Sequence, residues 1–372
     1  MSIDRATDFI PANGAYFLSH SVGRPLASAQ THFKDSFFSP WESSAGDPWG
    51  AWMGQLNGFC EALATLTHAR PSDICPQSNL SSAFTKVLSS LPKRAGQPVI
   101  VLSEHDFPTM GFVADQAQKL GYALRFLPRM SDHTDPQVWE DALSDDVQWL
   151  LVTQVQSNTG VQVPVADIVA AAKRRDVLTI VDVAQGTGVL PVDVSAWDAD
   201  FVLGSCVKWL CGGPGAGFLW VNPARIADCQ PQDVGWFSHA NPFEFDIHHF
   251  AYHPGAFRFW GGTPSVAPFV LAAHSIRYFS DIGVDVVRTH NLALTQRIMD
   301  ALPEGWLVSP RAPSQRSGTL LIHAGDQQQA VQDALKSREI RFDIRATGMR
   351  LSPHIYTTAA EVDLLIDTML HA

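Results

Sequence analysis

Short apolar runs rich in β-branched residues alternate with helical patterns through the middle of this chain, and no other feature restricts the fold as much. Helical spacing of apolar residues is clear at 110–121 and 165–176. The apolar runs between and around them lie at 98–102, 149–153, 178–183 and 201–204. Such an alternation predicts a mostly parallel sheet with helices on both faces. Ligands of such sheets bind beyond the carboxyl ends of the strands.

The pattern of helical and strand-like segments changes near position 256. From there, helical patterns such as 291–302 are interleaved with strand-like runs such as 318–324. We therefore predict an α/β fold with a large domain at 31–255 and a smaller α+β domain at 256–372. The first residues, 1–30, are too few to fold alone and should pack on the small domain.

Composition and charge indicate a small-molecule ligand. The 372 residues are 46% hydrophobic, which is enough for a large core, and the net charge of -11 comes without any basic cluster. A nucleic acid or an anionic membrane is therefore not expected as the main partner. The start of the chain lacks a basic segment followed by an apolar run, so we predict a cytoplasmic protein. The five cysteines show no paired spacing, which predicts reduced core residues and no metal site.

Lys208 is the only charged residue between positions 201 and 220, and it follows a run that should be a buried strand. A buried ammonium without a partner is costly. A desolvated lysine loses its proton more readily and becomes a nucleophile for an aldehyde cofactor. The alternative is a lysine at a strand end whose amine reaches solvent.

Asp182 ends the neighbouring apolar run. A carboxylate at the carboxyl end of a parallel strand faces the ligand crevice, where it can keep a pyridine nitrogen protonated. Alone, Asp182 could equally cap a helix or stabilise a turn. Together with Lys208 it predicts a site for pyridoxal 5'-phosphate (PLP), held as a Schiff base on the lysine.

Asp182, Gln185, Ser205 and Lys208 resemble the class V aminotransferase branch of fold type I PLP-dependent enzymes, and within that branch the chain is most similar to kynureninases. Further similar motifs run along nearly the whole chain: FLSHSVG at 17–23, DFPTM at 106–110, NTG at 158–160, KWLCGGPG at 208–215, GWFSH at 235–239, GGTPS at 261–265 and IRATGMRLSPHIYTT at 344–358. The resemblance implies a large PLP-binding domain, a small C-terminal domain and a homodimer with active sites at the interface.

Phosphate binding needs backbone donors at a helix start and nearby hydroxyl groups. The polar opening of SNLSSAFTKVLSSL supplies both, although it is also an ordinary capped helix. The resemblance assigns the phosphate to Asn79, Leu80, Ser81, Ser205, Trp236 and Thr263. It places Thr263 in the site of a second subunit.

The resemblance also assigns residues around the cofactor ring. Phe107 is the expected stacking partner and His105 the alternative, while the plain interpretations are a core phenylalanine and a loop histidine. Gln185 and Asn158 are expected to hydrogen-bond the phenolic oxygen of the ring.

Arg350 is the expected ligand of the substrate carboxylate, because a planar guanidinium binds a carboxylate with two hydrogen bonds. Arg345 should hold structure nearby. The resemblance adds His239 and Ser21 as substrate-binding residues. The aromatic-rich region 237–260 could enclose an aryl substrate, or could be a surface loop packed by its own aromatic residues.

Four functions stay open. A kynureninase-like lyase would cleave the Cβ–Cγ bond of an aryl-containing amino acid hydrolytically, and an aminotransferase would release a keto acid. A cysteine desulfurase or selenocysteine lyase needs a nucleophilic cysteine in the C-terminal part, yet none follows Cys229. A non-catalytic protein of the same fold is the fourth. Three departures from the kynureninase pattern put kynurenine in doubt as the substrate: Val207, Met110 and Asn158 stand where kynureninases have tyrosine, aspartate and arginine.

Overall fold

A seven-stranded sheet forms the centre of the computed structural model, which describes residues 5–43 and 46–372. Its strand order is β1-β7-β6-β5-β4-β2-β3. The five strands from β6 to β3 are parallel, and β7 runs antiparallel between β6 and β1. The mostly parallel sheet predicted from the sequence is therefore confirmed. The strands are β1 (Ile74–Gln77), β2 (Val99–Ser103), β3 (Ala123–Leu127), β4 (Val147–Thr153), β5 (Leu178–Asp182), β6 (Phe201–Ser205) and β7 (Gly217–Val221).

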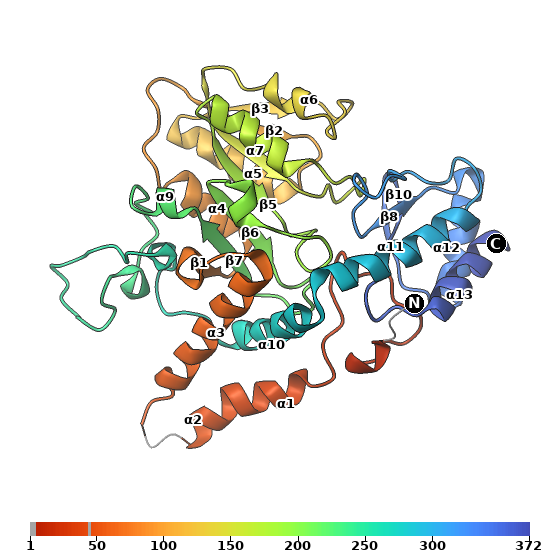
Figure 1. Ribbon diagram of the computed structural model, residues 1–372, viewed down its shortest axis with the longest axis horizontal. Helices are drawn as coiled ribbons and strands as arrows, with labels where there is room; N and C mark the ends of the chain where they lie inside the picture. Colours follow the sequence, from red (N-terminus) through yellow and green to blue (C-terminus); the bar gives the residue numbers. More distant parts are fainter. Residues whose placement is uncertain (1–4, 44–45) are drawn as a thin grey trace.

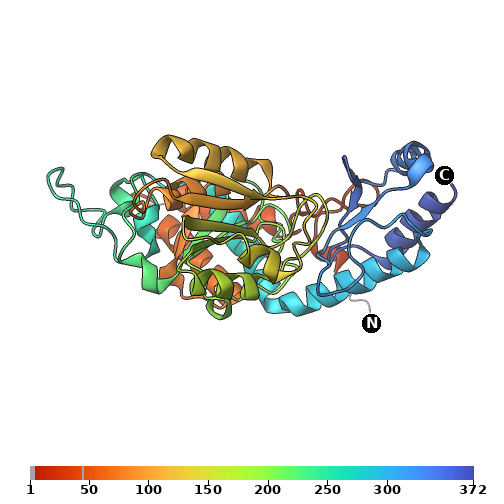
Figure 2. The same ribbon diagram turned by 90° about the horizontal axis from the view of Figure 1, so that it is seen from above.

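Helices cover both faces of this sheet (Figure 2), which explains why β4 and β7 are buried along their whole length. Where the structure describes the chain, it contains no helix of the length and apolarity that a membrane crossing requires. The helices of this part are α1 (Ala29–Phe33), α2 (Ser39–Ser43), α3 (Trp49–Thr67), α4 (Leu80–Leu88), α5 (Pro108–Ala117), α6 (Pro136–Glu140), α7 (Val165–Arg174), α8 (Val194–Trp197), α9 (Pro223–Ile226) and α10 (Ala267–Ile282).

A smaller unit with its own core lies beside the large one (Figure 1). Its antiparallel sheet has the order β8-β10-β9. The N-terminal segment joins this core through Ala15 and Phe17, and the Phe17 amide donates to the Arg341 carbonyl at 3.0 Å. The elements are β8 (Leu320–Ile322), β9 (Asp343–Arg345), β10 (Gly348–Leu351), α11 (Val284–Ala301), α12 (Gln328–Ser337) and α13 (Ala359–Leu370).

The two cores meet along α10 and α11, which run from the large unit towards the small one (Figure 1). Helix α10 packs on α3, and its buried Phe269 and Ile276 belong to the large core, as does Val287 of α11. The next turns of α11 bury Leu294 in the small core. The small core therefore begins well after position 256, because the apolar face of α10 packs on α3. The helical spacing of the apolar residues in α10 does not indicate which of the two cores they join.

Candidate active site

Polar side chains from four strands meet at the carboxyl edge of the large sheet. Thr153 at the end of β4 pairs with Asp182 at the end of β5. Ser205 ends β6 and pairs with Gly217 of β7, which in turn pairs with Gln77 at the end of β1. This register places the start of α4, which follows β1, beside Ser205. The edge is the one at which parallel α/β sheets bind their ligands.

A cavity of about 170 Å³ lies at this edge. Lys208 and Asp182 both line it, so the pair singled out in the sequence comes together in the fold. We call it the inner cavity. Its lining residues are Leu80, Ser81, Phe107, Thr109, Met110, Thr153, Val155, Ser157, Asp182, Ala184, Gln185, Ser205 and Lys208.

Lys208 is held in a desolvated position by the loop after β6. Burial lowers the pKa of its amine to about 8, against an opposing attraction from Asp182 and with a further lowering by Arg350. The Nζ atom lies 5.8 Å from the centre of the Phe107 ring. The lowered pKa gives the amine nucleophilic character near neutral pH that an exposed lysine lacks.

Asp182 is 5% exposed, and its Oδ1 accepts a hydrogen bond from the Ala184 amide at 2.8 Å. Burial raises the pKa of this carboxyl group, and the Ala184 amide and Lys208 oppose the shift. A second carboxyl group lies close by: burial raises the pKa of Asp106 to about 7, and the charge of Asp182 contributes to that shift. The inner cavity is thus lined by one lysine and one carboxyl group in a desolvated setting, with a second carboxyl group close by, which is typical of functional sites.

The start of α4 offers backbone donors to the cavity. Asn79 caps the helix, since its side chain accepts from the Ser82 amide at 2.9 Å. The amides of Leu80 and Ser81 precede the first intrahelical hydrogen bonds and stay available to an anion. Asn79 itself is exposed and is not among the residues that line the cavity. Its contribution is to fix the helix start, as a capping residue does.

Phe107 and His105 have different places. The Phe107 ring faces the cavity from the start of α5. His105 turns away from it, with Nε2 3.0 Å from the Arg129 carbonyl oxygen, and does not line the cavity. Gln185 does line it: Nε2 donates to the His20 carbonyl at 3.2 Å, while the buried Oε1 has no hydrogen-bond partner among the described residues.

Arg350 lies behind Ser157 rather than in the lining itself. Its Nη1 donates to the Ser157 carbonyl at 2.8 Å, and its Nε and Nη2 donate to Asp343 Oδ2. Asp343 also pairs with Arg345 at 3.1 Å and lies 3.4 Å from His20 Nε2. Burial alone would raise the pKa of Asp343, yet its interactions with His20 and Arg350 hold it well below the usual range. Arg345 is half exposed, as expected for a structural role.

A larger groove of about 1120 Å³ continues outward from the inner cavity, and Phe107 and Ser157 line both. Asn158 and Arg345 line this outer groove, whose apolar surface comes from residues such as Phe126. The Asn158 Oδ1 atom is buried and has no hydrogen-bond partner among the described residues. Asn158 therefore faces the entrance rather than the inner cavity.

Besides Asn79, His105 and Arg350, four more residues expected in the site line neither space within this chain. Trp236 and Thr263 lie together, with Trp236 Nε1 3.3 Å from Thr263 Oγ1. His239 pairs with Glu244 on a segment that projects from the large unit. Ser21 is exposed. Their expected roles need either a second subunit or a different function.

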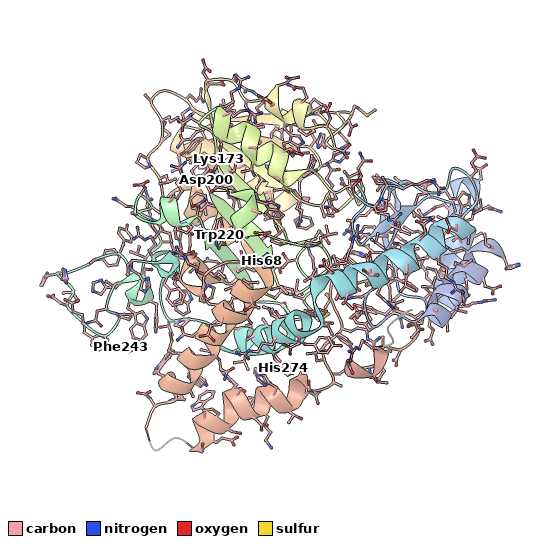
Figure 3. All side chains as sticks on the ribbon, viewed as in Figure 1. His68, Lys173, Asp200, Trp220, Phe243 and His274 are labelled. Atoms are coloured by element: carbon pink, nitrogen blue, oxygen red, sulfur yellow. The ribbon has the colours of Figure 1, made fainter. Side chains whose placement is uncertain are left out.

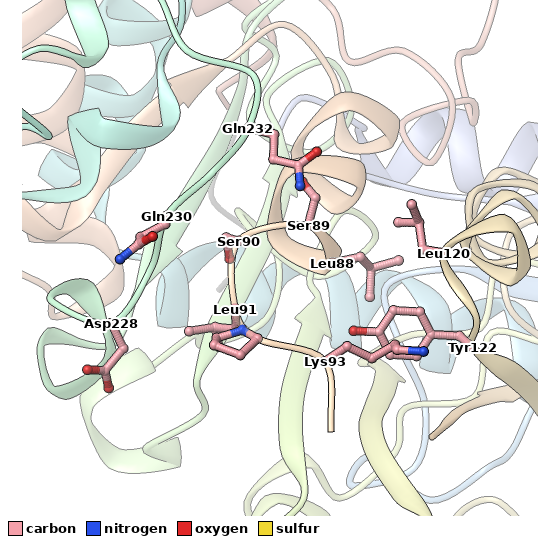
Figure 4. Close-up of a pocket in the computed structure, with 11 residues that line it drawn as sticks. Leu88, Ser89, Ser90, Leu91, Lys93, Leu120, Tyr122, Asp228, Gln230 and Gln232 are labelled. Carbon is pink, nitrogen blue, oxygen red and sulfur yellow. The ribbon is translucent and has the colours of Figure 1, made fainter. Parts of the chain in front are cut away.

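Another hollow lies at the opposite edge of the sheet (Figure 4). Leu120 and Tyr122, which precede β3, line it together with residues 88–93, which precede β2. It has a volume of about 440 Å³. Residues before parallel strands lie at the amino edge, away from Lys208, so this hollow is not the candidate active site.

Three residues in or near the site, Thr153, Asp106 and Asp343, are not among those predicted from the sequence. Thr153 ends the apolar run 149–153, and the rule that residues at strand ends face the ligand crevice, which selects Asp182, selects Thr153 too. Asp106 and Asp343 have no such signal, because the role of Asp106 comes from Thr153 and Asp182, far away in the sequence, and that of Asp343 from the register of a β-hairpin. Asp343 faces Arg350 across the β9–β10 hairpin.

A mostly parallel sheet that brings a desolvated lysine and a buried carboxylate together at its carboxyl edge is the arrangement found in PLP-dependent enzymes of fold type I. The model of the aminotransferase class-V family matches residues 53–365, and this chain belongs to that PLP-dependent family.

Comparisons with individual proteins support this family assignment. A kynureninase from Deinococcus radiodurans is 32% identical over 276 residues, which cover 71% of this chain and 65% of that protein. A kynureninase from Pseudomonas fluorescens is 27% identical over 375 residues, covering 95% and 88% of the two chains. The solved structure of a cysteine desulfurase from Thermococcus onnurineus NA1 superposes with a TM-score of 0.87 at 20% identity, over 100% of this chain and 98% of that one. This last likeness shows the fold.

Proposed function

We propose that this enzyme is a kynureninase-like hydrolytic lyase, which cleaves the Cβ–Cγ bond of an aryl-containing amino acid with PLP bound to Lys208. The observation that carries the proposal is the meeting of Lys208, Asp182 and Phe107 around one cavity at the carboxyl edge of the sheet. The kynureninase relatives favour this reaction over others of the family.

The cavity residues fit PLP. The free amides of Leu80 and Ser81 and the hydroxyl of Ser205 would bind the phosphate. Asp182 would pair with the ring nitrogen, and Phe107 would stack on the ring. Gln185 would donate an Nε2–H to the phenolic oxygen, because it lines the cavity and, among the described residues, only its hydrogen bond to the His20 carbonyl holds its amide group in the present orientation. When bound, PLP supplies an electron sink for the bond that breaks in the substrate.

Lys208 has two tasks in this proposal. It would hold the cofactor covalently through its amine in the resting enzyme, and the amine would then move the proton at the substrate α-carbon as a general base. A pKa of about 8 suits the second task, because the amine can accept and return a proton near neutral pH. The buried Asp182 would pair with the ring nitrogen and favour its protonated form.

Substrate binding would use Arg350 and the outer groove. The guanidinium is held by Asp343 and Ser157, and its remaining N–H groups would bind the α-carboxylate. The outer groove, with Phe126 and Phe107 on its walls, would accept the aryl group. One water would complete the reaction: its hydroxyl group would add to the ketone carbon, the Cβ–Cγ bond would break with its electron pair on Cβ, and a proton from the water would end on Cβ, which gives an aryl acid and alanine.

The same proposal includes a homodimer. The antiparallel bridge between His239 and Tyr252 closes a projecting loop, 239–252, which we call the arm (Figures 1 and 3). Its Phe243, Phe245 and Ile247 are 55%, 75% and 92% exposed, which is unusual for apolar side chains that no partner covers. A second copy is the natural cover, with Trp236 and Thr263 reaching the partner's phosphate site.

The dimer can be tested by light scattering on the purified protein. We expect a dimer for the native chain and dissociation for the double variant Phe245→Glu, Ile247→Glu. A native monomer would contradict this part of the proposal. The cytoplasmic location stays a prediction from the sequence.

The other functions are separable from the lyase. For a desulfurase, all five cysteines are buried, and burial raises the pKa of each thiol, that of Cys75 to about 12. None is a ready nucleophile. An aminotransferase would use the same cavity, so it is the second candidate. A non-catalytic protein would not need the desolvated amine of Lys208.

Two experiments test the proposal. Borohydride reduction of the PLP-loaded enzyme should attach the cofactor to the peptide that contains Lys208; the Lys208→Ala variant should lose this label and the exposed control Lys119→Ala should keep it.

Single turnovers with kynurenine, 3-hydroxykynurenine and a panel of amino acids then distinguish the reactions. Alanine and anthranilate formed without a keto acid support the lyase, whereas conversion of the cofactor to its amine form indicates the aminotransferase. No label on Lys208 would refute the whole proposal.

A further inference from the structure

The arm brings together three side chains that can ligate a metal ion. His239 lies at its base, with Nε2 2.9 Å from Glu244 Oε2, and His249 Nδ1 lies 2.7 Å from Glu244 Oε1. One ligand atom from each of the three residues lies within 4.8 Å of the other two. We propose that His239, Glu244 and His249 form a binding site for one divalent transition-metal ion, with zinc as the best match.

The donor set supports this assignment. Two imidazoles and one carboxylate suit zinc and its neighbours in the first transition row, whereas magnesium and calcium prefer oxygen ligands alone. In a tetrahedral site with bonds of about 2.0–2.1 Å, ligand atoms lie about 3.4 Å apart. Because the ligand atoms of the cluster lie within 4.8 Å of one another, no pair has to close by more than about 1.4 Å. Glu244 and His249 are exposed on a loop, where such a movement needs no repacking of the core.

His239 is already oriented as a metal ligand. It is 7% exposed, and its Nδ1 lies 2.9 Å from the Ala251 carbonyl oxygen, so an Nδ1–H can donate there while Nε2 faces Glu244. Histidines that bind metals commonly donate their second ring N–H to a backbone carbonyl in this way. In the other tautomer Nδ1 accepts from the Ala251 amide at 2.9 Å, and Nε2–H donates to Glu244. A proton and a metal ion are therefore alternatives at Nε2.

A metal ion bound at this site would fix the conformation of the arm. Between residues 240 and 251 the arm contains no helix or strand, and its apolar side chains are exposed. A metal ion that joins residues 239, 244 and 249 would close two short loops across this segment and fix its conformation. The fourth position stays open to water, as in sites with three protein ligands. The inference does not depend on which reaction the enzyme catalyses.

Calorimetric titration of the PLP-loaded, chelator-treated full chain with zinc chloride tests the site. We expect one zinc ion per chain and no comparable binding of magnesium. Glu244→Gln and His249→Ala should each weaken zinc binding at least about tenfold. His248→Ala is the matched control, since His248 is the neighbouring histidine outside the cluster, and it should bind zinc like the native chain.

A second readout is limited chymotrypsin digestion in the Phe245→Glu, Ile247→Glu background, in which the proposed dimer is dissociated and Phe243 is an accessible cleavage site within the arm. Zinc should slow cleavage there in this background and with His248→Ala added, but not with Glu244→Gln added. The proposal is overturned by native protein that binds no zinc, by Glu244→Gln and His249→Ala that bind it unchanged, or by a His248→Ala variant that loses it. Equal cleavage rates with and without zinc would also refute the fastening role.

Discussion

Arg350 donates to Asp343 Oδ2 through Nε at 3.0 Å, across the hairpin that joins β9 to β10. The arginine is 3% exposed, and its hydrogen bonds fix the orientation of its guanidinium behind Ser157. Of its five N–H groups, three are used by Asp343 and Ser157. In the proposed function the other two would bind the substrate carboxylate, and their fixed orientation would lower the entropy cost of binding.

The first prediction concerns Arg350. Replacing it by lysine keeps the charge but removes the fork of donors, so we expect the KM for the amino-acid substrate to rise about 10- to 100-fold, with a smaller change in kcat. Arg345→Lys is the control. Arg345 is 45% exposed and pairs with the same Asp343, and its substitution should change the KM less than about twofold. Equal effects of the two variants in steady-state assays would contradict a role for Arg350 in binding the carboxylate.

The second prediction concerns the ring of Phe107. Phe107→Leu keeps an apolar side chain but loses the stacking surface, so the affinity for PLP should fall about 2- to 10-fold. Spectroscopic titration of cofactor-free protein with PLP measures this. Phe112→Leu on the same helix is the control, since Phe112 is 69% exposed and does not line the cavity. A Phe107→Leu variant with native affinity would show that the ring does not touch the cofactor.

The third prediction follows from the pKa of Lys208, which burial lowers from 10.5 to about 8. At pH 7 both the folded and the unfolded chain carry the proton, so the folded state bears the full cost of the buried charge. Lys208→Met should therefore raise the free energy of unfolding of the cofactor-free protein by about 1–3 kcal/mol at pH 7. Between pH 8 and 10.5 the folded native chain loses its proton first, and the advantage of the variant should shrink.

Urea unfolding at pH 7 and pH 10 measures this difference. Lys119→Met, at an exposed position, should show no comparable dependence on pH. A difference between Lys208→Met and the native chain that stays constant with pH would mean that the lysine is not desolvated.

The fourth prediction concerns the close approach of Gly23 to Lys208. A Cβ atom at position 23 would lie 2.1 Å from the Lys208 carbonyl oxygen and 2.5 Å from Cys211 Sγ. Gly23→Ala must therefore displace the lysine loop, and we expect a loss of about 1–3 kcal/mol in the free energy of unfolding, together with weaker PLP binding. Gly54→Ala, on the exposed face of α3 with nothing near its Cβ, should instead gain about 0.5–1 kcal/mol. Thermal unfolding of both variants with and without PLP checks this, and a neutral Gly23→Ala would disprove the contact.

Part of the site was predictable because strand ends carry positional information. Once apolar runs are recognised as parallel strands, residues such as Asp182, Ser205 and Lys208 must gather at one edge. The same rule applies to Thr153. It does not apply to residues further along the loops: His105 contacts the Arg129 carbonyl oxygen, and Asn79 caps a helix. Both lie beside residues that do line the cavity, so sequence position alone could not separate them.

The arm shows the same limit. The spacing of His239, Glu244 and His249 matches no metal-binding motif, and no metal site was expected from the sequence. Their ligand atoms meet because the bridge between His239 and Tyr252 folds the segment back on itself. Likewise, the buried residues of α10 join the large core because α10 packs on α3, which its helical pattern does not reveal. The domain boundary near residue 256 stays a prediction from the sequence.

The sequence by itself determined the layered α/β architecture, the lysine and its aspartate, because periodic apolar spacing and an uncompensated charge are local properties of the chain. Only the tertiary structure decided that Asp343 binds Arg350, that Gly23 lies against Lys208, and that Trp236 does not line its own chain's cavity. The first relation depends on the register of a β-hairpin, and the other two depend on how elements far apart in sequence pack. Local patterns encode neither.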